Sequence, residues 1–573
     1  MLKLNSYDFK NIINPAGYIG GEYNQVIKEK SNIKVRYAMC FPDIYEKSVN
    51  NINLKTMYSM LNNRIDTWCE RVYAPCKDFE NLMRKKKIKM YGLESKDYLD
   101  SFDIINFNLD DEMQYTNVLN IIDLCNIPLY AKDRQIRFPF VMATGKCTDN
   151  PYPLSPFIDI YIIGEFEEVI SLIIDKYMEW KNEIGSKIKF LNSIKDIDGV
   201  YIPLLHTNKN NINRVIIKNL NSVEYAKTPI VSNIKNNNDK IYIEVERVNS
   251  IKNRLNFEND NIRENTVQKI VSLAKTNYIY TGINEICLDF NYLEKYYNMV
   301  ELIEEMLKFT NENKIKLSFR NLKLNADNIL LLKKINYDTK QCITLDIGAS
   351  SQRLRDIICS NITEKNILDF AKVAFENNFN NINLKFKIGL PSEDYLDLND
   401  ILDICNKIFN EYYKIPKKQR KRKCSISITT EIFIPKPHTF FECFEQASQN
   451  KLEMKQQFLN DKLTKKNIRY IYDDIFQKNI LGYIQKGDVT TGKVIYNAWR
   501  FGSRFDNNKN YFDYNIWMKA LEKENIKIED YINKRYDINY EFCFDNIYTG
   551  INKEDIKQEY SKILKLLEHN ISK

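Results

Sequence analysis

Three asparagines stand at a regular spacing behind a strand-like segment near the middle of the chain. The segment IYIEVERV (241–248) has the apolar composition of a buried strand, and Asn249, Asn253 and Asn256 lie in the polar stretch after it. Their amide oxygens are hard, uncharged donors and are poor ligands for soft metal centres. Asparagine is also unusually frequent along the whole chain, so the triplet alone does not indicate a binding site.

The other residues able to ligate metals or transfer protons are scattered. The chain has 12 cysteines but no C-x-x-C or C-x-x-x-C-x-x-C, and three histidines, which argues against a local zinc or iron–sulfur motif. His438 follows Pro435 and Pro437 in what we expect to be a rigid loop. It is a candidate proton donor or substrate contact, with a structural hydrogen bond as the alternative.

The elements that must position these residues alternate between strand and helix over residues 1–204. Apolar runs predict strands at 34–41, 102–109, 137–145 and 158–164, with helices at 49–63, 112–125 and 165–180. This alternation predicts an α/β, Rossmann-like domain with a parallel sheet. Ligands of such sheets bind at the carboxyl ends of the strands, which here are the loops at 42–48, 144–154 and 164–168.

A second alternation follows an asparagine-rich connector at 205–240. Six strands are predicted within 241–450, at 241–248, 284–290, 314–319, 342–347, 381–388 and 424–434. Six strand–helix repeats predict a partial (β/α)6 TIM barrel, in which reactive loops gather at the carboxyl ends of the strands. Residues 451–573 are predicted to form a mostly helical C-terminal domain.

The composition of the chain favours a globular protein over a membrane-spanning or secreted one. With 573 residues, a net charge of +8 and 44% hydrophobic residues, the chain has the make-up of a globular protein. It shows no apolar segment of membrane-spanning length and no secretory signal, so we expect it in the cytoplasm. The basic run KKQRKRK (417–423) predicts either a solvated turn or a contact to RNA or phosphate.

Several segments together resemble the cobalamin-binding radical SAM proteins. They are YIGGEYN (18–24), FPDIYE (41–46), CERVYAP (69–75), LESKDYLDSFDIINF (93–107), YTNVLN (115–120), QRLRD (352–356), IGLPSED (388–394), IPKPHTFF (434–441) and WRFGSRFD (499–506). The resemblance implies an N-terminal B12-binding-type domain, a radical SAM barrel and a C-terminal extension. It also implies a 4Fe–4S cluster, S-adenosylmethionine and cobalamin, with three cluster cysteines spaced C-x-x-x-C-x-x-C after the first barrel strand.

In this chain Asn249, Asn253 and Asn256 occupy those three cysteine positions. Neutral amides should not retain a cluster that needs anionic sulfur. Gly348 stands where the resemblance implies an acidic residue, and Phe166 replaces a glycine. The resemblance places Gly389 and Glu393 on the SAM side, although a tight turn explains them equally well. It places Asp43, Gly145, Gly164 and Glu165 in the cobalamin-side crevice.

Four hypotheses remain open. The favoured one is a degenerate radical SAM homologue with a binding or scaffolding role toward an unknown protein or RNA partner. The second is an active enzyme, for methyl transfer or RNA or protein modification, whose cluster is held by the distant Cys287, Cys342 and Cys424. The third is an RNA-binding protein that uses the basic run. The fourth is retained cobalamin or nucleotide binding by the N-terminal domain alone.

Overall fold

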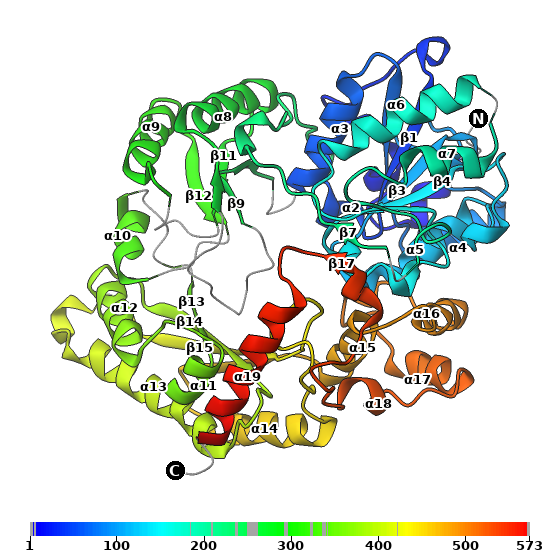
Figure 1. Cartoon of the computed structure of the whole chain (residues 1–573). Coiled ribbons are helices and arrows are strands. Elements are labelled where there is room, and N and C mark those ends of the chain that lie inside the picture. The colour runs from blue at the N-terminus through cyan, green and yellow to red at the C-terminus, as the bar shows by residue number, and fades with distance from the viewer. Residues whose placement is uncertain are drawn as a thin grey trace.

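The computed structural model of the chain contains an N-terminal α/β region, a second region of parallel strands and a helical C-terminal region (Figure 1). It describes residues 4, 7–183, 185–207, 210–234, 239–248, 262–290, 296–320, 325–334, 340, 342–420 and 422–569. The predicted α/β class with parallel sheets is confirmed.

The N-terminal sheet has six strands in the order β2-β1-β3-β4-β5-β6. The strands are β1 (Val35–Phe41), β2 (Thr67–Tyr73), β3 (Ile104–Asn108), β4 (Phe140–Thr144), β5 (Ile160–Ile162) and β6 (Val200–Tyr201). The four pairs from β2 to β5 are parallel, and β6 pairs antiparallel with β5. The order reverses between β1 and β3, so the ligand crevice of such a sheet would open there.

Helices cover both faces of this sheet (Figure 1). They include α3 (Ile52–Asn63), α4 (Lys77–Lys86), α5 (Tyr115–Leu124), α6 (Val169–Asn182) and α7 (Lys187–Ile194). Nearly every residue of β1, β3, β4 and β5 is buried, which is why their sequences read as continuous apolar runs. The strand β2 was not predicted, because Glu70 and Arg71 interrupt its apolar run although both are buried.

The predicted six-stranded barrel is seen as two parallel sheets among the described residues. One sheet joins β8 (Ile241–Glu244), β11 (Glu285–Asp289) and β12 (Lys316–Arg320). The other joins β13 (Ile343–Gly348), β14 (Asn381–Ile388), β15 (Ser425–Ile432) and β16 (Ile468–Tyr472). The additional strand β16 lies in the range expected to be helical; it pairs in parallel with β15 and extends the second sheet.

Strand β14 alternates strictly between apolar and polar residues. In β14, Ile382, Leu384, Phe386 and Ile388 are buried in one cluster with apolar residues of α12 (Glu364–Glu376) and α13 (Tyr395–Lys414). Helices α8 (Val267–Thr281), α9 (Met299–Glu312) and α10 (Ala326–Lys334) also pack along the outside of the sheets (Figure 1). The intervening polar residues therefore point to the opposite, inner side of the sheets.

The predicted first barrel strand is split. After β8 the chain turns at Val245 into β9 (Glu246–Val248), which pairs antiparallel with β10 (Ile262–Glu264). The sequence that bears the three asparagines, 249–261, connects β9 to β10 and lies outside the described residues.

The C-terminal region packs against the N-terminal region. Its helices are α14 (Gln449–Lys462), α15 (Ile475–Gln485), α16 (Thr491–Arg500), α17 (Tyr514–Lys523), α18 (Glu529–Ile532) and α19 (Lys553–His569). Helix α16 packs along α5, and β17 (Ile547–Tyr548) pairs in parallel with β7 (Ile212–Asn213) of the connector. Within the described part of the chain, no helix combines the length and apolarity needed to span a bilayer.

Candidate functional site at the carboxyl ends of the strands

The point where the N-terminal strand order reverses is closed by hydrogen bonds between side chains. Asp43 follows β1 and is only 2% exposed. Its Oδ2 accepts hydrogen bonds from Gln114 Nε2 at 3.1 Å, Asn507 Nδ2 at 2.7 Å and Lys47 Nζ at 3.1 Å. Because Gln114 follows β3, the loops on the two sides of the crevice are joined directly, and Asn507 of the C-terminal region closes over them.

The segment before Asn507 explains one of the motifs found in the sequence. Asp506 is fully buried, and its Oδ atoms accept hydrogen bonds from Thr116 Oγ1 at 2.6 Å and Trp517 Nε1 at 3.1 Å. Arg504 donates to both carboxylate oxygens of Glu80 on α4, at 3.1 and 3.2 Å. The WRFGSRFD motif therefore fixes the C-terminal region onto α4 and α5, a structural role that its position in the sequence did not reveal.

Two predicted cofactor-side glycines are required by the chain's own backbone. Gly145 has φ +109°, and a Cβ there would lie 2.5 Å from the carbonyl oxygen of Leu109. Gly164 has φ +101°, and a Cβ there would lie 2.3 Å from the carbonyl oxygen of Val215. In both places the space that a ligand would need next to the glycine holds another segment of this chain.

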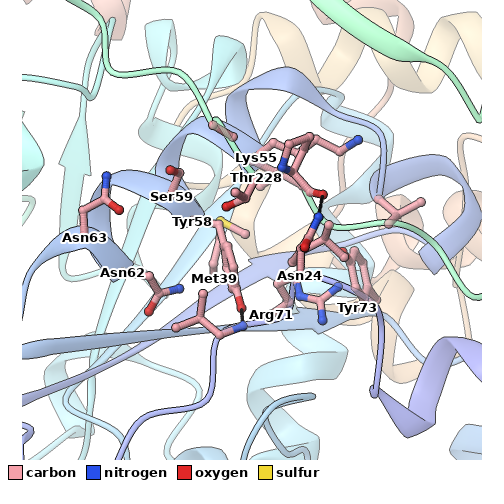
Figure 2. A pocket seen from close by; sticks show the side chains of 16 residues that line it. Asn24, Met39, Lys55, Tyr58, Ser59, Asn62, Asn63, Arg71, Tyr73 and Thr228 are labelled. Carbon is pink, nitrogen blue, oxygen red and sulfur yellow. Dashed lines mark hydrogen bonds between the residues drawn. The ribbon is translucent and has the colours of Figure 1, made fainter. Parts of the chain in front are cut away.

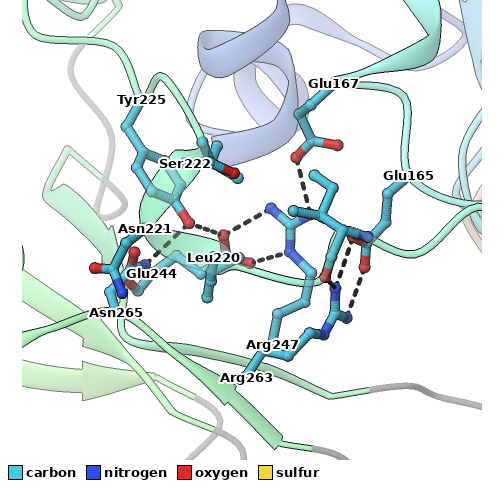
Figure 3. Close-up of polar contacts among 12 residues, drawn as sticks. Glu165, Glu167, Leu220, Asn221, Ser222, Tyr225, Glu244, Arg247, Arg263 and Asn265 are labelled. Carbon is cyan, nitrogen blue, oxygen red and sulfur yellow. Dashed lines mark hydrogen bonds and ion pairs between the residues drawn. The ribbon is translucent and has the colours of Figure 1, made fainter.

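The predicted residue Glu165 belongs to an ion-pair network that joins the two α/β regions (Figure 3). Arg263, on β10, donates to both carboxylate oxygens of Glu165, at 2.7 and 2.8 Å. Arg247, on β9, lies 3.3 Å from Glu165 and 2.8 Å from Glu167. Burial alone would raise the pKa of Glu165, but Arg263 and Arg247 lower it below its ordinary value. Burial raises the pKa of Glu167, which Arg247 only partly opposes.

The same network extends to β8 and the connector. Arg247 Nε donates to Glu244 Oε1 at 2.9 Å, and Tyr225 donates to Glu244 Oε2 at 2.6 Å. Asn265 Nδ2 donates to the Tyr225 hydroxyl at 3.0 Å. The strands β9 and β10, which flank the segment 249–261, are thus both fixed to the β5–α6 loop. Sequence reasoning did not identify either arginine.

A second buried network explains the motifs nearest the N-terminus. Arg71 of β2 is 3% exposed and donates to both oxygens of Glu22, each at 2.8 Å, and to Glu94 at 2.6 Å. These three residues come from the segments YIGGEYN, CERVYAP and LESKDY. A buried arginine held by two carboxylates ties three distant segments to one edge of the sheet.

A small cavity lies beside this network, between α3 and the sheet (Figure 2). It has a volume of about 70 Å³ and is lined by Lys55, Tyr58, Arg71 and Thr228, among others. Burial lowers the pKa of Lys55 to about 8. Cavities of this size hold a few water molecules, whereas sites for drug-sized ligands span about 300–1,000 Å³.

These observations test the fit of cobalamin at the predicted crevice. Asp43 bonds across it to Gln114, Gly145 and Gly164 face backbone carbonyls, and Glu165 is paired with Arg263. The predicted crevice residues are therefore engaged with one another and with the rest of the chain, and their arrangement does not fit a corrinoid.

The predicted SAM-side residues form a closed turn. Gly389 has φ +80°, and its N–H donates to Glu393 Oε2 at 2.7 Å. The same oxygen accepts from Lys455 of α14 at 2.6 Å. Burial raises the pKa of Glu393, and Lys455 opposes that shift. This geometry forms a tight strand-to-helix turn, which was the alternative explanation of the two residues. Glu393 Oε2 is engaged within the turn, whereas its buried Oε1 accepts no hydrogen bond from the described residues, and the contact to SAM stays a prediction.

His438 is buried and makes structural contacts. Its Nε2 lies 3.0 Å from the carbonyl oxygen of Asp149, and its backbone N–H donates to Glu442 at 2.9 Å. The ring also packs against Phe544, with centroids 5.1 Å apart. A structural hydrogen bond accounts for this residue, and its catalytic role stays a prediction.

The three barrel cysteines do not form a ligand set. Cys287 is buried within β11, where burial raises its pKa to about 11. Cys342 is exposed and Cys424 is buried in the outer core, and both precede their strands, at the ends away from the expected reactive loops. Among the residues that the structure describes, no three or more histidine, cysteine, aspartate or glutamate side chains are grouped so as to hold a metal ion. Asn249, Asn253 and Asn256 lie outside the described residues.

The basic run is partly used within the fold. Residues Lys417–Gln419 form a short 3-10 helix. The Arg420 guanidinium donates to the carbonyl oxygens of Ile415 and Tyr413, at 2.7 and 2.6 Å, and lies over the ring of Tyr413. The run lies before β15, also away from the carboxyl ends of the strands.

Comparisons with known proteins agree with part of the resemblance. Residues 53–203 match the family described as radical SAM proteins, N-terminal. An uncharacterized protein of Methanocaldococcus jannaschii is 24% identical over 422 residues, which cover 72% of this chain and 84% of that protein. Among solved structures, the radical S-adenosylmethionine methyltransferase TsrM of Kitasatospora setae, with tryptophan and a SAM analog bound, aligns with a TM-score of 0.43. That alignment has 9% identity and covers 69% of this chain and 73% of TsrM.

Proposed function

We propose that this chain is a radical-SAM-like protein that has lost cluster-dependent chemistry and acts by binding a partner. One observation carries the proposal: the sequence has no cysteine between Cys147 and Cys287. The segment 249–261 therefore offers no thiolate at the place where the resemblance implies three. Amide oxygens do not replace the soft, anionic sulfur that iron–sulfur clusters need.

The residues that flank this segment, and those at the predicted cofactor crevice, support a protein that keeps its fold without its cofactors. Arg247 and Arg263, on the two strands that flank this segment, form part-buried ion pairs with the N-terminal region. At the predicted crevice, Gln114 and Asn507 both donate hydrogen bonds to Asp43. These contacts join the regions of the chain to one another. A binding or scaffolding protein needs such contacts as much as an enzyme does.

We further propose that the partner is a protein, with RNA as the alternative. The best candidate for an RNA contact is the basic run. The guanidinium of Arg420, however, donates hydrogen bonds to carbonyl oxygens of its own chain. A steep fall of RNA affinity with rising salt would support the alternative.

Anaerobic iron–sulfide reconstitution tests the proposal. The wild-type chain should bind no stoichiometric iron or sulfide and should show no thiolate-to-iron absorption. The matched control is the triple variant Asn249→Cys, Asn253→Cys and Asn256→Cys, which returns thiolates to the same loop. Iron bound by the triple variant alone would support the proposal. Stoichiometric iron and sulfide in the wild type would overturn it.

A further inference from the structure

A largely apolar cavity lies between the N-terminal region and the start of helix α16. It has a volume of about 460 Å³, which is within the range of sites for small ligands. The N-terminal region contributes residues 130–132, 155–159, 191 and 203–204 to its lining, and the C-terminal region contributes residues 489, 492 and 493. None of these residues belongs to the barrel or to the segment 249–261, so the cavity is independent of iron binding.

The floor of the cavity is formed by apolar side chains of the N-terminal core. Phe157 and Ile158 are fully buried, and Leu191 is 1% exposed. The ring of Tyr130 packs beside them, with its centroid 5.1 Å from that of Phe157. An apolar chain placed on this floor would lose its contact with water, which is favourable.

Two large apolar side chains that line the same cavity are left exposed to solvent. Leu204, after β6, is 64% exposed, and Val489, before α16, is 49% exposed. A single exposed apolar side chain is ordinary on a protein surface. Here the two come from different regions of the chain and extend the apolar lining of one cavity outward, so a bound chain would cover both.

The cavity also carries two lysines on its lining, one from each region. Lys132 and Lys493 are exposed, and neither forms an ion pair with a residue that the structure describes. Asp133, the neighbour of Lys132 in the chain, is exposed but does not line the cavity. Two lysines beside an apolar floor favour a ligand that combines an apolar chain with a negative charge.

The one acid in the lining does not offset these lysines. Among the described residues that line the cavity, Asp159 is the only acid, and it is 4% exposed. Its carboxylate lies 3.1 Å from Arg134 Nε and 2.7 Å from Lys187 Nζ. Because Arg134 and Lys187 already pair with it, Asp159 does not favour a cationic ligand in the cavity.

We propose that this cavity binds an amphiphilic anion, a molecule with an apolar chain and one carboxylate or phosphate group. The chain would lie on Phe157 and Leu191 and would be covered at the mouth by Leu204. The anionic group would meet Lys132 and Lys493. The apolar chain would supply most of the affinity, and the lysines would set the sign of the charge, since ion pairs of exposed lysines are weak.

Isothermal titration of the full-length chain at low salt tests this inference. The probes with an eight-carbon chain are octanoate, octyl phosphate, 1-octanol and octylammonium, and hexanoate and acetate are the shorter carboxylates. Octanoate or octyl phosphate should bind about fivefold more tightly than 1-octanol, and octylammonium should bind more weakly than 1-octanol. Each methylene between hexanoate and octanoate should raise the affinity about fourfold, and acetate should not bind.

The same titrations can overturn the inference. It fails if neither octanoate nor octyl phosphate binds, or if octylammonium binds as tightly as they do. It also fails if hexanoate and octanoate bind equally well, because the apolar floor would then take no part. Binding of only one of the two eight-carbon anions would support the inference and would identify the anionic group.

Variants locate the site. Leu204→Asp places a negative charge at the mouth in an exposed position, and should weaken octanoate binding by about tenfold. The double variant Lys132→Gln and Lys493→Gln should weaken it by about fivefold. Lys519→Gln, at an exposed lysine of α17 that does not line the cavity, is the matched control and should leave binding unchanged. Circular dichroism verifies folding, and wild-type affinity in both folded cavity variants would refute the assignment.

Discussion

Arg263 on β10 and Glu165 in the β5–α6 loop form a two-point ion pair, with N–O distances of 2.7 and 2.8 Å. Together with the ion pair between Arg247 and Glu167, it forms a junction between the two α/β regions (Figure 3). It fixes β10, the strand that follows the segment 249–261, to the N-terminal region. A residue expected to face a cofactor is thereby engaged in holding two parts of the chain together.

Arg263→Gln should destabilise the protein by about 3 kcal/mol, because it leaves the largely buried Glu165 carboxylate with a weaker partner. The free energy of unfolding, measured with denaturant, checks this. Lys176→Gln removes an exposed pair with Glu179 and is the control, for which no measurable change is expected. Equal effects of the two substitutions would contradict a structural role for the junction.

The contribution of Glu165 should depend on pH in a defined direction. Its folded-state pKa is below the ordinary value of 4.5, so its stabilisation is fully present above that pH and is lost as the pH falls through the folded-state value. The stability difference between the wild type and Glu165→Gln should therefore be largest near neutral pH and shrink below pH 4.5. A difference that grows in acid would show that the ion pair is not the source of the stabilisation.

Two glycines with nearly the same φ should respond differently to alanine. Gly164 (φ +101°) and Gly502 (φ +104°) both incur backbone strain of roughly 1–3 kcal/mol when substituted. Only at Gly164 would the new Cβ also meet a carbonyl oxygen, that of Val215 at 2.3 Å, whereas nothing lies within 4 Å at Gly502. Thermal unfolding should show the larger loss for Gly164→Ala, and a larger loss for Gly502→Ala would argue against the close approach of Val215.

Hydroxocobalamin should not bind to the N-terminal crevice. Asp43, Gln114 and Asn507 are bonded to one another there, and opening the crevice would break charge-assisted hydrogen bonds. Absorption of the protein peak after gel filtration with excess corrinoid checks this. Stoichiometric corrinoid in that peak would show that the crevice opens and would revive the predicted cofactor role of Asp43.

The sequence predicted elements better than it predicted the roles of individual residues. Apolar runs located β1, β3 and β14 because burial on at least one face dictates their composition. The sequence pattern missed β2, because its buried Glu70 and Arg71 form ion pairs with residues of distant segments. Topology correctly placed Asp43 at the carboxyl edge of the sheet, but its partner Asn507 is 464 residues away, and no local pattern reveals such a pair. The arginines of the junction were missed for the same reason.

The formation of 5′-deoxyadenosine from S-adenosylmethionine tests the central claim most directly. The wild-type chain, taken through anaerobic iron–sulfide reconstitution, is incubated with S-adenosylmethionine and a strong reductant. The account predicts no 5′-deoxyadenosine above a control without protein, because 249–261 provides no thiolate for a cluster. Formation that rises with protein concentration would contradict the account and would show that radical chemistry survives on an unusual ligand set.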